Sequence, residues 1–389
     1  MKPQVARVFQ RQSNPGLDGH PPGFPLDSQG MTGHGPKGPN YRRFPSREAL
    51  RSDKIHGHLS TPLASQMLAS HAKQMRAKSA IVLILFVALN SIWSCSKPPP
   101  FGDKIKVAAS IFPLADIVRN VGGDLVEVEV LIPPGASPHV FEPTPEAFRK
   151  FAQTRLFVMV GAGLEFWAQK LITATAGEDL VVVRAIDGVH LLRVDENHPA
   201  LQKHQAEDRE VPHEGDEHQG SNPHVWLDPL VVESLAQRIA LALIELSPEH
   251  AQDLRQRLDR YLEKLNDLDE TIRETVRQFP NKEFVAFHPA WSYFARRYGL
   301  VEVAVIQQSP GREPTPKDLQ KIIQAIEDYG IKAVFAEPQL NPSAASAIAS
   351  EAGVKVLFLD PLGGPDLLGR DSYIGLMDYN LEIMREAML

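Results

Sequence analysis

The sequence predicts an α/β protein of two lobes, each built on a four-stranded, mainly parallel sheet flanked by helices, with one long helix joining the lobes. Two observations predict this class. From Lys104 onward, short β-rich runs alternate with helical stretches, which is typical of parallel sheets. The chain has 389 residues, of which 43% are hydrophobic and 23% are charged, enough for about two domains of ordinary size, each with its own core.

Eight strands are expected, in two groups of four. The first group covers residues 105–109, 126–132, 156–160 and 180–184, and the second covers residues 283–287, 301–306, 333–336 and 354–359. Each group is expected to form the sheet of one lobe. The N-terminal lobe then spans residues 95–246 and the C-terminal lobe spans residues 281–389.

Two helix starts are predicted between the groups, each a capping residue followed by proline. They are Asp228-Pro229 and Ser247-Pro248. The second helix, predicted over residues 247–280, has apolar residues in steps of three and four, and at about 1.5 Å per residue it would extend on the order of 45 Å. We interpret it as an intramolecular connection between the lobes. A coiled-coil dimer is the alternative, although its seam would cover only about three to four heptads.

The first 94 residues differ in composition from the rest of the chain. They hold 12 Lys and Arg against 4 acids, whereas residues 95–389 hold 29 against 44. Closely spaced Pro and Gly without apolar periodicity predict a disordered extension over residues 1–74, and a true translation start at Met67 or Met75 is the alternative. The acidic balance of the larger part argues against a nucleic-acid partner.

Residues 75–94 have the parts of an export signal. A basic head precedes the apolar run at residues 80–89, which is too short to span a hydrocarbon layer of about 30 Å, so a transmembrane anchor is the less favoured alternative. Cys95 follows and is the single cysteine of the chain, an arrangement that resembles the lipidation site of bacterial lipoproteins. One cysteine excludes intramolecular disulfides, four-cysteine zinc sites and iron–sulfur clusters, so nitrogen and oxygen must hold any metal.

Residues 195–221 interrupt the α/β pattern. This segment has four histidines and eight acids against two bases, with almost nothing that could pack, and predicts a mobile loop. Its histidines favour weak, exchangeable zinc capture, and a solvated linker is the alternative. These histidines are His198, His204, His213 and His218.

Polar residues that follow strands are the candidates for the functional site, because ligands of open α/β sheets bind at the carboxyl ends of the strands. His288, Glu337 and Asp360 directly follow three predicted strands, whereas His139 and His224 lie in proline-containing loops. Imidazole and carboxylate together suit Zn²⁺, which they bind at about 2.0–2.2 Å in a tetrahedral array. Spacing alone leaves open that each histidine is a capping or core residue.

Five ordered motifs resemble those of the metal-binding solute receptors of bacterial ABC importers, and the zinc-uptake receptors in particular. The motifs are Ser137-Pro-His-Val-Phe-Glu-Pro143, Asn222-Pro-His-Val-Trp-Leu-Asp-Pro229, Ala286-Phe-His-Pro-Ala-Trp-Ser-Tyr-Phe294, Phe335-Ala-Glu-Pro-Gln339 and Phe358-Leu-Asp-Pro-Leu362. The resemblance extends over about residues 103–389 of the printed sequence. It implies two four-stranded lobes, a long rigid connecting helix and one ion bound in the cleft between the lobes.

The resemblance also implies the ligands, His139 and His224 from the first lobe and His288 and Asp360 from the second. Manganese receptors of this group usually have glutamate in place of the third histidine, so His288 indicates zinc, as does the preference of imidazole for Zn²⁺. A manganese or mixed receptor is the alternative. Glu337 is expected to accept the ring N–H of a ligand histidine, and a strand-end carboxylate exposed to water is the alternative.

The sequence therefore predicts an exported, lipid-anchored monomer of the periplasm or cell envelope that binds Zn²⁺ and delivers it to a permease with its ATPase. It does not predict an enzyme, because three histidines and Asp360 would leave no open coordination position. His213 and His218 are five apart with Gly215 between them, whereas the metalloprotease motif requires four. A zinc hydrolase and a surface adhesin are the alternatives from other classes.

Overall fold

Two four-stranded sheets, each with all its strands parallel, organise the computed structural model, which describes residues 104–175, 177, 179–193, 220–309 and 311–389. The N-terminal sheet has the order β2-β1-β3-β4 and the C-terminal sheet the equivalent order β6-β5-β7-β8. The strands are β1 (Ile105–Ala109), β2 (Val126–Val130), β3 (Leu156–Met159), β4 (Val181–Arg184), β5 (Glu283–Ala286), β6 (Val301–Val305), β7 (Ala333–Ala336) and β8 (Lys355–Phe358). The predicted fold class is confirmed, and both ends of each predicted strand lie within two residues of the ends of the corresponding observed strand.

Helices connect successive strands in both sheets, as parallel pairing requires. They are α2 (Phe112–Gly122), α3 (Pro145–Phe151), α4 (Ala168–Thr175), α6 (Pro229–Leu246), α7 (Ala251–Arg277), α8 (Ser292–Tyr298), α9 (Pro316–Tyr329), α10 (Ser343–Ala352) and α11 (Tyr373–Met388). Side-chain caps fix several starts: Asp228 accepts from the backbone N–H of Leu230 at α6, and Thr315 forms a capping box with Asp318 at α9.

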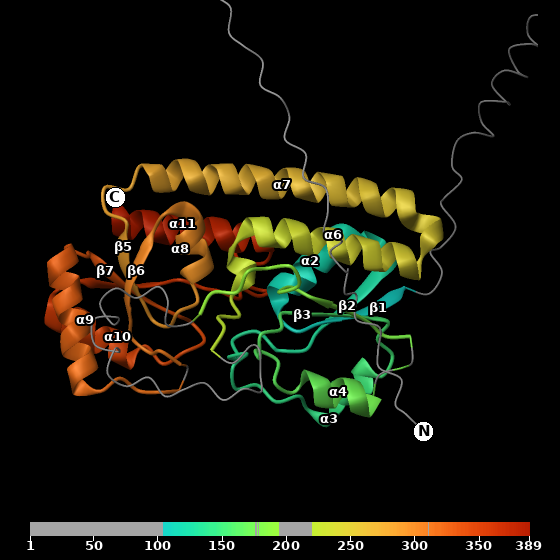
Figure 1. Ribbon diagram of the computed structural model, residues 1–389, viewed down its shortest axis with the longest axis horizontal. Coiled ribbons are helices and arrows are strands. Elements are labelled where there is room, and N and C mark those ends of the chain that lie inside the picture. The colour runs from blue at the N-terminus through green and yellow to red at the C-terminus, as the bar shows by residue number, and fades with distance from the viewer. Residues whose placement is uncertain (1–103, 176, 178, 194–219, 310) are drawn as a thin grey trace, which may run out of the picture. The chain divides into compact units, whose positions relative to one another are not determined.

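The long helix α7 runs past both sheets and packs on α2, α6 and α11 (Figure 1). Its inward face is buried along its whole length within the chain, as expected for the predicted intramolecular connection. The buried residues are Leu254, Tyr261, Leu265, Leu268, Ile272 and Val276.

The start of α7 differs from the prediction. Residues Pro248–His250 form a 3₁₀ turn, and α7 begins at Ala251. The Ser247 hydroxyl donates to the Glu249 carboxylate at 2.7 Å, and its oxygen accepts no backbone N–H at the start of this turn. The Ser-Pro pair therefore starts a tight turn between α6 and α7, because proline fits the first residue of either kind of helix equally well.

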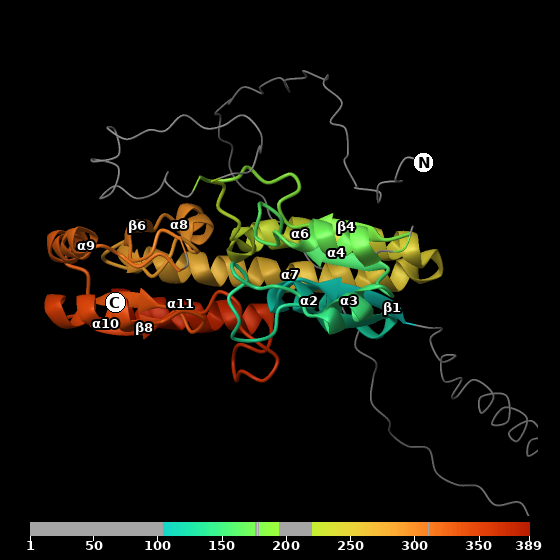
Figure 2. The ribbon, with the colours of Figure 1, turned by 90° about the horizontal axis from the view of Figure 1, so that it is seen from below.

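The last helix, α11, returns from the C-terminal sheet to the N-terminal half and lies beside α7 (Figure 2). Tyr373, at its start, is fully buried; its backbone N–H donates to Asp116 at 2.9 Å and its hydroxyl donates to the Trp226 carbonyl at 2.9 Å. One hydrophobic core consequently runs from the N-terminal sheet through the long helices to β5 and α8. A second, smaller core lies between the C-terminal sheet and helices α9 and α10.

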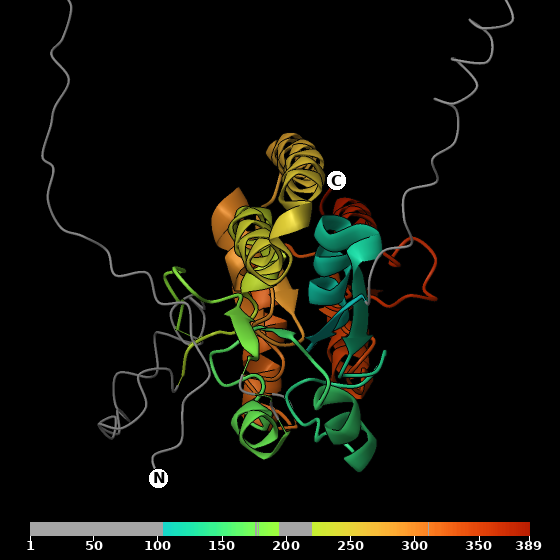
Figure 3. The same cartoon turned by 90° about the vertical axis from the view of Figure 1, so that its right-hand side faces the viewer.

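Viewed along the long axis, α2, α6 and α7 gather on one side of the N-terminal sheet, and α3 and α4 lie away from α7 (Figure 3). The ends of the predicted acidic loop meet here: Arg193 and Ser221 form an isolated antiparallel bridge, and the Tyr293 hydroxyl accepts from Leu192 N–H and donates to the Asn222 carbonyl. The segment that follows Asn222 is thereby fixed against α8.

Several predictions lie outside the described residues. These are the extension 1–74, the signal 75–94, the lipidation site Cys95 and the loop histidines His198, His204, His213 and His218. Within the described part of the chain, none of the helices combines the length and the apolar character needed to cross a membrane.

Candidate metal centre

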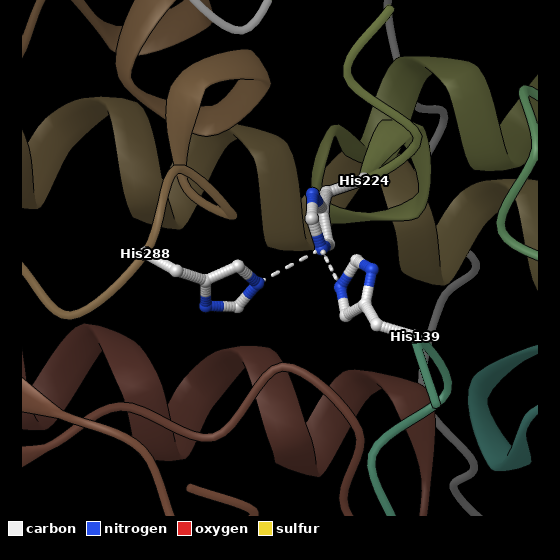
Figure 4. Close-up of side chains that lie close together, drawn as sticks. All are labelled: His139, His224 and His288. Atoms are coloured by element: carbon white, nitrogen blue, oxygen red, sulfur yellow. Dashed lines mark hydrogen bonds between the residues drawn. The ribbon is translucent and has the colours of Figure 1, made fainter. Parts of the chain in front are cut away.

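Three histidine side chains from three separate segments converge on one point (Figure 4). His139 lies in the loop between β2 and α3, His224 precedes the 3₁₀ turn Val225–Leu227, and His288 follows β5. The Nε2 atoms of His139 and His224 are 3.2 Å apart, and those of His224 and His288 are 3.1 Å apart. In the described part of the chain these residues form a group whose ligand atoms all lie within 4.8 Å of one another.

The backbone turns sharply at each histidine, which is why the three rings can leave their segments toward a common centre. Pro138 and Pro223 precede two of them, and proline cannot continue a strand or helix. At the third, the Ala290 N–H donates to the His288 carbonyl at 2.7 Å and closes a tight turn at the end of β5. The proline context noted in the sequence thus has a geometric consequence.

Asn222 fixes the tautomer of His224. Its amide nitrogen donates to the Pro289 carbonyl at 2.6 Å, and a carbonyl can only accept, so Oδ1 must face His224. There Oδ1 accepts from the backbone N–H of His224 at 3.0 Å and from its ring Nδ1 at 2.7 Å. The ring proton therefore sits on Nδ1, and the Nε2 lone pair points at the centre. Sequence analysis missed this role, although the Asn-Pro-His order, typical of an Asx turn, was a usable signal.

Glu337 plays the same part for His288. It follows β7, and its carboxylate accepts from His288 Nδ1 at 2.5 Å, with both residues buried. A carboxylate that accepts at Nδ1 leaves the Nε2 lone pair free to face the other rings. This contact is the one expected for Glu337, and its effect on a bound ion stays a prediction.

Burial favours the neutral form of two of the histidines, His139 and His224. Desolvation, followed by the charge of His288, lowers the pKa of His139 to about 3 from its ordinary value of 6.5. Burial, followed by the charges of His288 and His139, holds the pKa of His224 well below its ordinary range. Neutral imidazole is the form that binds a metal, so these two rings need not lose a proton when an ion arrives at neutral pH.

Asp360 is not brought into the histidine group. It follows β8 and is fully buried; its Oδ2 accepts from Arg370 at 2.9 Å. Its Oδ1 accepts from the amide of Gln339 at 2.8 Å and from the backbone N–H groups of Leu362 and Gly363 at 3.0 Å. The carboxylate is thus occupied by four donors, and its assignment as the fourth ligand stays a prediction.

A small cavity opens beside the three rings. Its walls include Ser137 from the first lobe and Glu337, Gln339 and Leu362 from the second, so both lobes contribute to it. Its lining combines polar side chains such as Ser137 and Gln339 with apolar ones such as Leu340 and Leu362, as is usual for a site that holds a small ligand.

The chain is similar to proteins that are named for zinc uptake. A family model described as "Zinc-uptake complex component A periplasmic" matches residues 107–387. The chain is 28% identical over 291 residues to the "High-affinity zinc uptake system protein ZnuA" of Bacillus subtilis, a match that covers 74% of this chain and 89% of that protein.

Two further matches bear on the fold and on the length. The chain is 28% identical over 313 residues to the "Zinc-binding lipoprotein AdcA" of Streptococcus pneumoniae, covering 80% of this chain but only 61% of that longer protein. A solved structure titled "Crystal structure of ZnuA" superposes with a TM-score of 0.64 at 27% identity, covering 74% of this chain and 100% of that one. The fold is therefore shared over nearly all of the described residues.

Proposed function

Since the chain belongs to the family of zinc-uptake complex component A, periplasmic, we propose that it is an exported receptor that captures Zn²⁺ with His139, His224 and His288 and delivers it to the permease of an ABC importer. The ion is cargo and not a resident cofactor. The related proteins are named for zinc uptake and zinc binding, and the family is one of receptors and not of enzymes.

The convergence of the three Nε2 atoms carries the proposal. An ion about 2.0–2.1 Å from each nitrogen in a tetrahedral array would separate the nitrogens by about 3.3–3.4 Å, and the observed separations are 3.2 and 3.1 Å. The lone pairs of His224 and His288 are both directed inward by their outer partners. Two lone pairs at such a distance repel each other, so a cation between them is the favourable occupant.

The donor set favours zinc over manganese. Three imidazole nitrogens suit Zn²⁺, whereas Mn²⁺ prefers carboxylate, carbonyl and water oxygens. The carboxylate of Glu337 accepts from the outer nitrogen of His288 and so supports a ligand without replacing one. The names of the relatives agree with this preference.

The membrane anchor and the partners complete the proposal. Cys95 follows a signal-like segment, and one relative is named a lipoprotein, which supports lipidation of Cys95 in this chain. The partners are then a membrane, through the lipid, and a permease with its ATPase. Cys95→Ser should move the protein from the membrane fraction to the soluble fraction while zinc binding is unchanged, and retention in the membrane would contradict the anchor.

Competition between the two metals tests the function. Full-length protein is stripped with a chelator and equilibrated with equal amounts of Zn²⁺ and Mn²⁺, and its metal content is measured after dialysis. We expect one tightly held zinc per chain and little manganese. His224→Ala should lose that zinc, and the exposed His190→Ala, a matched substitution away from the centre, should keep it. Preferential manganese, or a normal zinc content in His224→Ala, would contradict the proposal.

A further inference from the structure

A buried glutamate of the C-terminal lobe belongs to the hydrogen-bond network around His224. Glu302 is the second residue of β6 and is only 2% exposed, although β6 lies at the edge of its sheet. Carboxyl groups are rarely buried so completely unless hydrogen bonds hold them. Oε2 of Glu302 lies 3.0 Å from the hydroxyl of Ser292, a buried residue at the start of α8. Neither residue belongs to the three-histidine group, so the buried pair requires another explanation.

An irregularity in the pairing of β6 directs Glu302 into the core. β5 and β6 pair regularly at Phe284 and Glu302, but the next pair is displaced by one position, so Val303 is an additional residue on β6. Side chains of a regular strand alternate between the two faces, whereas Glu302, Val303 and Ala304 are all buried here. A β-bulge of this kind turns the side chains beside it, and bulges are common next to functional sites.

The hydroxyl of Ser292 connects Glu302 to the outer partner of His224. Asn222 is fully buried, and its Nδ2 donates to the Pro289 carbonyl at 2.6 Å and to the Ser292 hydroxyl at 3.2 Å. The two amide hydrogens are thus both used. Oδ1 of the same amide accepts from Nδ1 of His224 at 2.7 Å. A continuous series of hydrogen bonds therefore runs from β6 through the start of α8 to the ring of His224.

Glu302 accepts a hydrogen bond in this series and needs no negative charge to do so. Burial raises the pKa of Glu302 to about 8 from its ordinary value of 4.5; the Ser292 contact opposes this rise, and the charge of Glu337 adds to it. The group is therefore mostly neutral at pH 7. A neutral acid accepts through its carbonyl oxygen, as the amide of glutamine does. Glutamine should consequently be able to replace Glu302, whereas alanine should not.

We propose that Glu302 is a positioning residue of the metal centre, which holds the ring of His224 in its metal-binding tautomer through Ser292 and Asn222. The identity of the ion rests on the proposed zinc-receptor function, but the orientation of the ring is a property of the metal-free chain. With Ser292 as an acceptor for its nitrogen, the Asn222 amide keeps its oxygen toward His224. An inverted amide would instead donate to Nδ1 and move the ring proton to Nε2, the atom that must bind the metal.

The tautomer of His224 provides the test, because long-range proton–nitrogen NMR shows which ring nitrogen carries the proton. Full-length, metal-free protein is labelled at the histidine nitrogens, and the His224 signals are those missing from His224→Ala. We expect the Nδ1-protonated ring in the wild type and in Glu302→Gln, and an additional Nε2-protonated population in Glu302→Ala and Ser292→Ala. An unchanged tautomer in both of these alanine variants would overturn the inference.

Zinc affinity gives a second measurement on the same variants. Glu302→Ala and Ser292→Ala should each weaken zinc binding by about 10-fold, the lower value usual for residues outside the coordination shell, because Asn222 keeps its bond to Pro289. Glu302→Gln should bind zinc as the wild type does, which separates a role in hydrogen bonding from a role of charge. A loss in Glu302→Gln equal to the loss in Glu302→Ala would overturn the inference.

Ser247 and Glu249 provide a matched serine–glutamate pair as a control. The Ser247 hydroxyl donates to Glu249 in the turn after α6, and His224 lies before the opposite end of this 18-residue helix, which is about 27 Å long. Ser247→Ala should change neither the tautomer nor zinc affinity. An effect as large as that of Ser292→Ala would mean general destabilisation and would overturn the inference.

Two further outcomes have a defined meaning. If Glu302→Ala does not fold by circular dichroism, Ser292→Ala alone decides, because it removes the hydroxyl that connects Glu302 to Asn222. Wild-type protein that takes up no zinc would contradict the proposed function. The tautomer of the metal-free protein would still support or overturn the positioning role, since that measurement requires no metal.

Discussion

His224 and His288 are held differently from His139. The first two are buried to 3% exposure, and each has an outer acceptor, Asn222 or Glu337, that fixes its tautomer. His139 is half-buried in a loop whose neighbour Val140 is 67% exposed, and among the described residues its only hydrogen-bond partner is His224.

This difference indicates that the three histidines contribute unequally to the proposed metal site. If the three histidines bind an ion as proposed, two of them are already oriented by outer partners, whereas His139 has no such partner among the described residues and has more side-chain freedom to lose on binding. The side of the centre formed by the His139 loop is consequently the side on which we expect an ion to arrive and leave.

The largest expected effect comes from removing a pre-organised ligand. His224→Ala and His288→Ala should each lower zinc affinity by more than about 100-fold, the upper value usual for residues outside the coordination shell. Titration against a zinc-binding dye of known affinity measures the loss. A smaller loss of zinc affinity in both variants would contradict the view that His224 and His288 are the firmly held ligands of the site.

His139→Ala should lower zinc affinity less than either of those variants. Water can reach a half-buried position and replace the missing nitrogen, whereas a buried position vacated inside the centre is filled poorly. The same dye titration, with zinc dissociation followed by stopped flow, gives both affinity and release rate. Equal losses in all three histidine variants would show that the His139 side is as rigid as the other.

The outer acceptors should matter next. Glu337→Gln and Asn222→Ala should each weaken zinc binding by about 10- to 100-fold, because the ring loses the partner that directs its lone pair inward. No comparable residue supports His139 among the described residues, so substitutions in its loop, such as Val140→Ala, should leave affinity unchanged. Normal binding in Glu337→Gln would show that burial alone orients His288.

Acid should destabilise the metal-free protein through His139 and His224, whose pKa values are lowered by burial. The pKa of His139 is lowered to about 3, so below its ordinary pKa of 6.5 the unfolded chain binds a proton that the folded chain does not. Stability therefore rises with pH through this window and is lost as pH falls. From pH 7 to pH 5.5 the loss is about 1 kcal/mol per such group, and urea unfolding of His139→Gln should show a smaller loss.

The smallest effect on the centre is expected from the acidic, histidine-rich segment. Deleting residues 195–219 keeps the Arg193–Ser221 bridge and the Asn222 contacts, so the tight zinc should remain. Additional weak equivalents should disappear from a calorimetric titration, because the histidines of this segment, predicted from its composition to be mobile, would have to be ordered on binding. Loss of the tight equivalent with an intact fold would mean that this segment supplies a ligand.

The strands and helices were predictable because their signals are local. The run that became β1 contains the β-branched residues Ile105 and Val107, the run that became β7 is apolar throughout, and the Asp228-Pro229 pair at the start of α6 consists of neighbours in the chain. The start of α7 was predicted less well, because a proline in a first turn does not distinguish a 3₁₀ turn from an α-helix. The choice depends on how α6 and α7 pack.

The candidate site also has a part that the sequence predicted and a part that it did not. His139, His224 and His288 could be named from the sequence, since each lies at a turn with a proline beside it. The contact of Ser292 with Glu302 and the pairing of Asp360 with Arg370 could not, because a side chain's hydrogen-bond partners depend on which segments folding brings within about 3 Å of one another. The sequence by itself determined which residues could bind a cation. The tertiary structure decided which of them face one another, because only packing determines which polar atoms come within hydrogen-bond distance.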